Sequence, residues 1–217
     1  NGHDNIGTDI SCFRFFKKGR TLLILVSIIL FLLFGCLLYM YYKAHHDTIN
    51  YSEIVNSKLP DSFDGFRIFF ISDIHRRKIN VQTIKKIKYP IDIVVIGGDL
   101  TEKGVPLKRT KENIQTLAQL HAPIYFVWGN NDYEVQPETL SKLLLEENVT
   151  ILTNIHNVIK RHHHTVTLYG LNHYEIEFNN RHDAIDTSEL KGDYTILLTH
   201  VPHTYYQLKQ DIQNEID

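Results

Sequence analysis

The pattern of hydrophobic and polar positions divides the chain into one long apolar stretch near its beginning and a later part in which short apolar runs alternate with helical patterns. Runs rich in β-branched and aromatic residues predict strands at 66–71, 91–96 and 124–128. A segment with helical spacing follows each of them, at 81–88, 107–120 and 137–147. Shorter runs predict further strands at 149–152, 157–160, 166–169 and 194–199. This alternation favours right-handed βαβ units and a mainly parallel sheet, so the expected fold class is α/β.

The apolar stretch runs from 21 to 42 and contains no charged residue. As a helix it would be about 33 Å long, which matches a hydrocarbon core of ~30 Å, and we expect one transmembrane helix. Four basic residues precede it: Arg14, Lys17, Lys18 and Arg20. After the stretch, Lys43 and Lys58 are the basic residues within a comparable distance. The positive-inside rule therefore predicts a cytoplasmic amino terminus and an extracytoplasmic domain in a single-pass protein of the cell membrane.

Two alternatives to a retained anchor are a cleaved signal peptide and a lipoprotein processing site at Cys36. No small-residue cleavage motif follows the apolar stretch, and the chain stays apolar beyond Cys36, so a retained anchor is the better interpretation. The expected organisation is a cytoplasmic segment at 1–20, a transmembrane helix at 21–42, a tether at 43–63 and a folded domain at 64–217. Both cysteines, Cys12 and Cys36, precede that domain, which therefore has no internal disulfide.

Residue types that bind metals recur directly after four of the predicted strands. They are Asp73, His75, Asp99, Asn130 and His200. Open α/β sheets place their ligands at the carboxyl ends of the strands, so these side chains are expected to meet at one edge. Residues two apart in a strand share a face, which lets Asp73 and His75 bind one cation together. Gly97 and Gly98 leave room for Asp99 to approach and bridge two cations.

An oxygen and nitrogen ligand set without thiolate favours two divalent ions, with Mn, Fe, Zn and Mg as candidates. Two ions roughly 3.5–4 Å apart can hold a bridging hydroxide that attacks a phosphate ester. The chain has no G-x-S-x-G motif, no catalytic-type cysteine and no phosphate-binding P-loop that would indicate another nucleophile or another phosphate chemistry. Its net charge of −2 and the lack of a basic and aromatic binding pattern disfavour nucleic acid as a partner.

These motifs resemble the calcineurin-like metallophosphoesterase superfamily, especially its bacterial membrane-anchored members. The resemblance covers about residues 64–217 and rests on D-x-H at 73–75, G-D at 98–99, G-N-x-D at 129–132 and a later strand-ending histidine, His200. It implies a β-sandwich flanked by helices and a hydrolase of phosphate esters that uses two divalent metals. Asp73 and His75 would bind one ion, Asp99 would bridge both, and Asn130 and His200 would bind the second.

Two departures from the family pattern affect the expected chemistry. The family usually has G-N-H-D, but this chain has Asn131 in place of the histidine, and an amide has no titratable proton to give to a leaving group. Asn131 could still hydrogen-bond the phosphoryl group. Asp132 is expected to orient Asn130, and the alternative is that it only caps the following turn. The family's closing G-H-x-H block would lie beyond Asp217. We therefore expect a partial sequence, with that block within a few tens of residues further on. His203 is a poor substitute for it.

The motifs and their two departures from the family pattern are compatible with two functions. The favoured hypothesis is a membrane-anchored phosphoesterase, a phosphatase whose candidate substrates include lipid-linked or envelope-linked phosphates close to the membrane. The alternative is a catalytically degenerate scaffold that binds a partner, as the change at Asn131 would allow. The full ligand set favours the enzyme, because a scaffold has no physical need for it. Three consecutive histidines at 162–164 are expected to form an exposed hairpin turn and no metal site.

Overall fold

The computed structural model describes residues 7–45, 47–172, 192–208, 213 and 216. The chain splits into two compact units, Asn1–Thr48 and Ile49–Asp217. The first unit contains helix α1 (Gly7–His45), which includes the expected span and continues past it at both ends. Its stretch Arg20–Lys43 is long and apolar enough to cross a membrane, judged by length and composition.

The second unit contains the predicted parallel sheet. Sheet A is formed in spatial order by β1 (Ile68–Ile71), β2 (Ile93–Ile96), β3 (Ile124–Phe126) and β4 (Val149–Ile151). All three neighbouring pairs are parallel. The parallel order of the strands brings the loops after β1, β2 and β3 to one edge of the sheet, as the sequence predicted.

Helices connect these strands at the expected places: α2 (Val81–Ile84), α3 (Leu107–Ala118) and α4 (Pro137–Glu146). Helix α4 begins with Pro137, where the missing N–H has no intrahelical partner to lose. Helix α2 is shorter than the predicted 81–88 segment. Pro90 disfavours helical backbone at Tyr89, and the close lysines of that segment repel one another, so the helix ends at Ile84.

Sheet B contains β5 (Ile155–Arg161), β6 (His164–Leu171) and β7 (Tyr194–Thr199). Strands β5 and β6 are antiparallel, and β6 pairs with β7 in parallel. The turn between β5 and β6 contains His162 and His163, both exposed, which confirms the expected hairpin. A short helix, α6 (Thr204–Gln207), follows β7.

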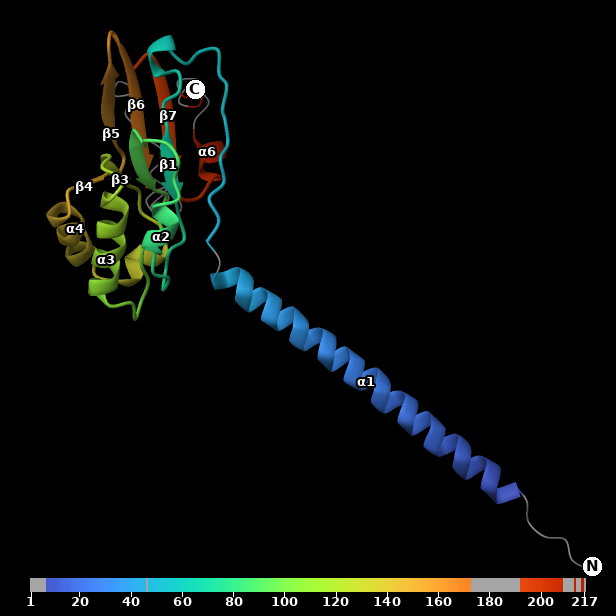
Figure 1. Ribbon diagram of the computed structural model, residues 1–217. Helices are drawn as coiled ribbons and strands as arrows, with labels where there is room; N and C mark the ends of the chain where they lie inside the picture. Colours follow the sequence, from blue (N-terminus) through green and yellow to red (C-terminus); the bar gives the residue numbers. More distant parts are fainter. Residues whose placement is uncertain (1–6, 46, 173–191, 209–212, 214–215, 217) are drawn as a thin grey trace, which may run out of the picture. The chain divides into compact units, whose positions relative to one another are not determined.

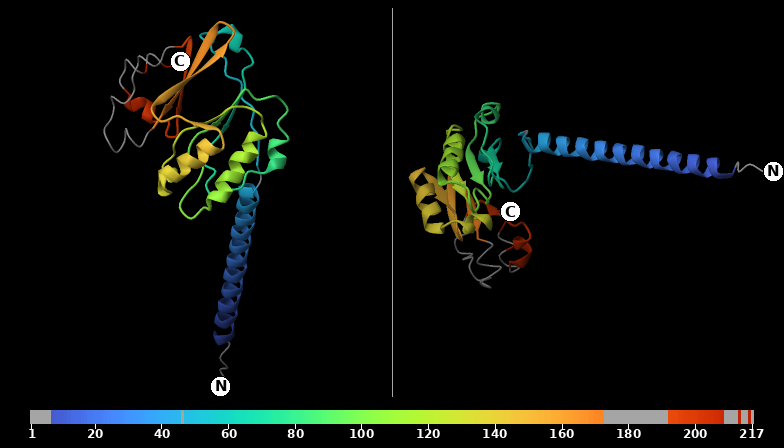
Figure 2. Two further views of the ribbon diagram at one scale, coloured as in Figure 1. Left: turned by 90° about the vertical axis from the view of Figure 1, so that its left-hand side faces the viewer. Right: turned by 90° about the horizontal axis from the view of Figure 1, so that it is seen from below.

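Two apolar clusters place sheet A in the middle of the unit. Because side chains alternate along a strand, Val94 and Ile96 of β2 pack with α3 and α4, while Ile93 and Val95 face the opposite way and pack with sheet B. Every residue of β2 is buried. Figures 1 and 2 show the resulting layers, with α3 and α4 on the side of sheet A away from the β5–β6 hairpin. This is the expected helix-flanked β-sandwich.

Part of the segment expected as a tether at 43–63 packs on the second unit. Asn56 donates a hydrogen bond of 2.9 Å to the Tyr194 hydroxyl, and Leu59 packs against the cluster between the sheets. Phe63 ends the short 3-10 helix Asp61–Phe63 and is buried in that cluster. The folded unit therefore begins at Ile49, only a few residues after α1.

Candidate metal centre

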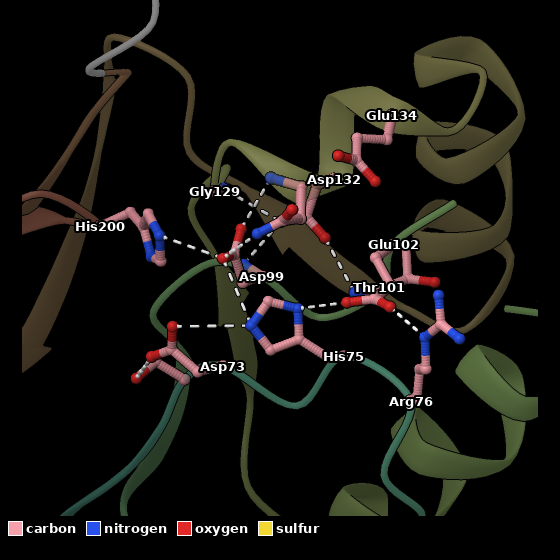
Figure 3. A network of polar contacts seen from close by, with 12 residues as sticks. Asp73, His75, Arg76, Asp99, Thr101, Glu102, Gly129, Asp132, Glu134 and His200 are labelled. Carbon is pink, nitrogen blue, oxygen red and sulfur yellow. Dashed lines mark hydrogen bonds and ion pairs between the residues drawn. The ribbon is translucent and has the colours of Figure 1, made fainter. Parts of the chain in front are cut away.

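The loops after β1, β2 and β7 bring three of the predicted ligands together at the carboxyl edge of sheet A. Ligand atoms of Asp73, Asp99 and His200 all lie within 4.8 Å of one another. His75 lies beside this group: its Nε2 is 3.8 Å from Asp73 Oδ1 and 3.5 Å from Asp99 Oδ2. In Figure 3, Asp73 and His200 approach Asp99 from two sides and His75 from a third.

Asp99 is the centre of the group. Its carboxylate is 4% exposed, and its Oδ2 lies 3.4 Å from His200 Nε2 in addition to the contact with His75. Asn131 donates two hydrogen bonds to it, from the backbone N–H to Oδ1 at 2.9 Å and from the side-chain amide to Oδ2 at 2.7 Å. In this structure the Asn131 amide therefore holds the central carboxylate in place.

Both histidines direct Nε2 at the carboxylates and have their other ring nitrogen beside an acceptor. His200 Nδ1 lies 2.9 Å from the Gly97 carbonyl oxygen, which can only accept, so Nδ1 is the donor of this hydrogen bond and Nε2 faces the carboxylates. His75 Nδ1 lies 2.9 Å from Glu102 Oε2, at an ion-pair distance without the alignment of a hydrogen bond. Imidazoles that bind metals are oriented in this way by carbonyls and carboxylates. The donor set fits a divalent cation.

Glu102 was not predicted as a ligand, and the structure gives it a different part in the site. Its other carboxylate oxygen accepts a short hydrogen bond from Arg76. That bond lowers the pKa of Glu102 and raises the pKa of the Arg76 guanidinium. An ionised Glu102 thus faces His75 and favours the ring orientation that points Nε2 at Asp99. Apart from the nearness of Glu102 to Asp99, no pattern in the sequence indicated this contact.

We expect Glu102→Gln to weaken binding of Mn²⁺ by roughly 10–100-fold, because the amide keeps the size of the side chain but loses the charge beside His75. Calorimetric titration of the purified full chain measures this. Glu112→Gln is the matched control, since it breaks the exposed Lys78–Glu112 ion pair of 2.9 Å away from the site. Equal affinity in the two variants would contradict the role given to Glu102.

The backbone at the site adopts an unusual conformation. Asp73, His75 and Asp99 have φ values of 55°, 50° and 52°, in the left-handed region that non-glycine residues seldom occupy. Each such residue costs on the order of 1–3 kcal/mol unless its surroundings enforce it. Here the Asp99 carbonyl accepts hydrogen bonds from the N–H groups of Ile74 and His75, at 2.8 and 3.1 Å. The loops after β1 and β2 are therefore locked together in the geometry that gathers the ligands.

Gly98 provides space for His200 at this junction. Its φ is 90°, and a Cβ atom at Gly98 would lie 2.6 Å from His200 Nδ1 and 2.9 Å from the Gly129 Cα. The sequence had attributed this glycine to the approach of Asp99. The structure shows that it also admits the imidazole from β7.

Asp132 is completely buried and connects two loops of the site. It accepts backbone hydrogen bonds from Asp99 and Gly129, at 2.8 and 2.9 Å, and from Thr101 at 3.0 Å. Burial raises the pKa of Asp132 to about 6 with help from the charge of Asp99, while the three N–H donors oppose the shift. Its hydrogen bonds to described residues go to these loops and not to Asn130, which the sequence analysis had expected it to orient.

The remaining predicted residues lie at the margin of the site. Asn130 is exposed at the start of the 3-10 helix Asn131–Glu134, and its side chain makes no cap hydrogen bond there. It lies four residues after the end of β3, at the same edge of sheet A as Asp99. His203, considered a poor substitute ligand, is exposed at the start of α6, and the group of Asp73, Asp99 and His200 does not include it.

A helix-flanked parallel sheet with aspartate and histidine side chains gathered at its carboxyl edge is typical of α/β proteins that bind metals. The model of the calcineurin-like phosphoesterase family matches residues 66–216, and the chain belongs to this family. Members of the family use divalent metals, and Asp73, Asp99 and His200 form a group here that can hold one.

Similar proteins agree with this assignment. The chain is 38% identical over 145 residues to the uncharacterized protein YpbG of Bacillus subtilis (strain 168), covering 66% of this chain and 56% of the relative. It is 31% identical over 176 residues to a zebrafish (Danio rerio) transmembrane protein with a metallophosphoesterase domain, covering 73% of this chain and 40% of the relative. The chain thus spans about half the length of these relatives.

Among solved structures, the phosphopantetheinyl hydrolase PptH of Mycobacterium tuberculosis aligns with a TM-score of 0.41 and 13% sequence identity. The alignment covers 69% of this chain and 74% of the other.

Proposed function

We propose that the protein is a membrane-anchored phosphoesterase that hydrolyses a phosphate ester with two divalent metal ions. The arrangement around Asp99 is the observation that supports this most strongly. Its Oδ2 lies 3.5 Å from His75 Nε2 and 3.4 Å from His200 Nε2, so one buried carboxylate oxygen faces two oriented imidazoles. Asp73 and His75 would hold one ion, and Asn130 and His200 the other, with Asp99 between them.

Ions bound at these positions would acidify a water molecule to serve as nucleophile and would neutralise charge on the phosphoryl oxygens. The residues of the chain position these groups. Glu102 and the Gly97 carbonyl keep the two imidazoles oriented, and Asn131 fixes the plane of the Asp99 carboxylate through both of its oxygens. We propose Mn, Fe, Zn or Mg as the ions, because the donor atoms are oxygens and imidazole nitrogens without a thiolate.

Hydrolysis of a chromogenic phosphomonoester or phosphodiester by the complete natural protein with added Mn²⁺ tests the proposed activity. We expect turnover that depends on metal and that a chelator removes. If Mn²⁺ binds but several mono- and diesters are not hydrolysed, the scaffold hypothesis replaces the enzyme.

Asn131 leads to a prediction about the leaving group. An amide cannot protonate a departing alkoxide, and the Asn131 side chain is already engaged with Asp99. We therefore expect aryl phosphates, whose leaving groups are acidic, to turn over at least 10²-fold faster than alkyl phosphates, the range that general acid catalysis normally contributes. Steady-state rates on a series of esters measure this. Equal rates for aryl and alkyl esters would contradict it.

The anchor is proposed to place the amino terminus in the cytoplasm and the catalytic unit on the other side. Support comes from the apolar stretch Arg20–Lys43 and from the basic residues that precede it. Protease treatment of sealed inside-out membrane vesicles tests this orientation. The second unit should be protected, and its digestion in sealed vesicles would reverse the assignment.

A further inference from the structure

A group of basic and aromatic side chains lies at the edge of sheet A opposite the metal centre. The members of this amino-edge cluster are Tyr51, Arg67, Lys85, Lys86, Lys88 and Tyr89, and all six are exposed. Arg67 directly precedes β1, and residues 85–89 lie between α2 and β2. The cluster therefore lies where these parallel strands begin, whereas the metal centre lies where they end.

Direct contacts hold the cluster together. The rings of Tyr51 and Tyr89 meet edge to face, with centroids 6.2 Å apart. The Arg67 guanidinium lies over the Tyr89 ring at 5.0 Å, a cation–π distance. The backbone N–H of Lys88 donates a hydrogen bond of 3.4 Å to the Tyr51 hydroxyl. Tyr51, two residues into the folded unit, is thus attached to this edge.

The positive charges of the cluster are not neutralised within the described part of the chain. None of its four cationic side chains forms an ion pair with a described residue; the adjacent Asp92 accepts the backbone N–H of Arg67 at 2.7 Å. Basic residues elsewhere on the unit do have acidic partners, as in the pairs Lys78–Glu112 and Lys111–Glu147, both at 2.9 Å. The cluster therefore presents a net positive surface that suits an anionic partner.

Chain length keeps this surface close to the end of the apolar span. The span ends at Lys43, and eight residues further on Tyr51 is already part of the cluster, a reach of at most about 29 Å even when fully extended. Such a short link gives a high effective concentration, so a weak affinity for lipid headgroups is enough for docking. Tyrosine and lysine side chains suit this interface, with apolar stems and polar ends.

A hollow lined by both apolar and polar side chains, Gln119 and His121 among the latter, opens at the same edge of the sheet. Its lining includes Ile87, Tyr89, Ile91 and Leu120, beside Lys85. Exposed lysines bordering apolar side chains are the combination that peripheral membrane surfaces use, since the charges meet headgroups and the apolar groups reach the acyl boundary.

We propose that the amino-edge cluster docks the second unit on the anionic surface of the bilayer in which the apolar span is anchored, with the metal centre turned away from that surface. The inference rests on the anchoring in the proposed function. Strand β1 lies between Arg67 and Asp73, which are six positions apart along the chain, so at most about 20 Å separates them at opposite edges of the sheet. The site therefore takes a water-soluble phosphate ester from the aqueous side, in preference to headgroups of the same bilayer.

Lysine footprinting of the full chain tests the docking. The protein is incorporated into nanodiscs of phosphatidylcholine alone or of phosphatidylcholine with phosphatidylglycerol, and lysines are acylated sparingly and quantified by mass spectrometry. In the anionic discs at low salt, Lys85, Lys86 and Lys88 should react at least about threefold more slowly than in neutral discs. The exposed Lys103 and Lys108 serve as internal references and should not change. High salt should remove the protection.

Matched variants separate docking from general effects of mutation. The double change Tyr51→Ser and Tyr89→Ser should reduce the protection of the three lysines, whereas Tyr206→Ser, which alters a tyrosine that is 79% exposed on α6, should leave it intact. Equal acylation in both kinds of disc overturns the proposal. Protection by millimolar inorganic phosphate in neutral discs also overturns it, because a small-anion site would then explain the charges.

Turnover in the same discs tests the orientation. Hydrolysis of a water-soluble ester should be equal in neutral and anionic discs, and a several-fold loss in anionic discs would mean that the bilayer covers the site. The lysine acylation pattern does not depend on catalysis. Absence of activity in both kinds of disc would therefore refute the proposed enzyme, while the acylation pattern would still decide whether the second unit docks. Failure to enter nanodiscs would refute the anchor and the docking together.

Discussion

Asp99→Asn should abolish most of the activity, with kcat/KM falling by at least about 10³-fold, or about 4 kcal/mol of transition-state stabilisation. The substitution keeps the size of the side chain. It replaces one carboxylate oxygen by an amide nitrogen, which has no lone pair for a cation, and it removes the charge that faces His75 and His200. Hydrolysis of a chromogenic ester with added Mn²⁺, together with calorimetric Mn²⁺ binding, measures both consequences.

Asp92→Asn is the matched control for this substitution. Asp92 accepts the backbone N–H of Arg67 at 2.7 Å, at the opposite edge of sheet A, and carries the same chemical group in a place away from the ligands. Its substitution should change turnover less than about twofold, within the range of surface changes. Retention of a tenth or more of the activity by Asp99→Asn would mean that this carboxylate does not bridge metals.

Gly129→Ala should have the second largest effect. A Cβ atom at this position would lie 2.2 Å from Asp99 Oδ1 and 2.3 Å from the Asp99 backbone nitrogen. The backbone nitrogen cannot move aside cheaply, so the loop after β3 must withdraw and break the hydrogen bonds that Asn131 and Asp132 make to Asp99. We expect turnover to fall at least about 10²-fold, because a displacement of catalytic groups by about 1 Å has an effect of this size. The free energy of unfolding should fall by about 1–3 kcal/mol.

Gly104→Ala separates this crowding from ordinary backbone strain. Gly104 has a φ of 85° but nothing within 4 Å of an added Cβ atom. Its replacement should cost about 1 kcal/mol of stability and leave turnover nearly unchanged. Thermal unfolding and kcat/KM of both variants provide the comparison. Wild-type turnover in Gly129→Ala would show that the two loops need not meet closely.

The strands of sheet A could be predicted because the residue pattern that specifies a strand lies within a few consecutive residues. The apolar run at 91–96 contains β2, and its alternating side chains fill the two clusters on either side of sheet A. Asp73 and Asp99 could be found because each follows such a run, and parallel strands bring their carboxyl ends together. His200 also follows an apolar run, but its strand β7 belongs to sheet B, so its approach to the other two depends on how the two sheets pack. The length of α2 was the exception, since the pattern at 81–88 suggested a longer helix than the chain forms before Pro90.

The supporting contacts of the site could not be predicted, because they depend on how loops from distant parts of the sequence meet. Nothing in the spacing of the G-N-N-D block indicates that Asp132 accepts N–H groups from the loop after β2. The link from Arg76 through Glu102 to His75 depends on the left-handed backbone at His75, which no residue pattern specified. The glycines beside the predicted ligands were the one indication that these loops meet, because backbones can approach closely only where no side chain intervenes.

Anomalous diffraction from crystals of the full chain soaked in Mn²⁺ tests the central claim most directly. We predict two manganese peaks roughly 3.5–4 Å apart on either side of the Asp99 carboxylate, one beside Asp73 and His75 and the other beside His200 and Asn130. A single peak, or peaks away from Asp99, would contradict the dinuclear site.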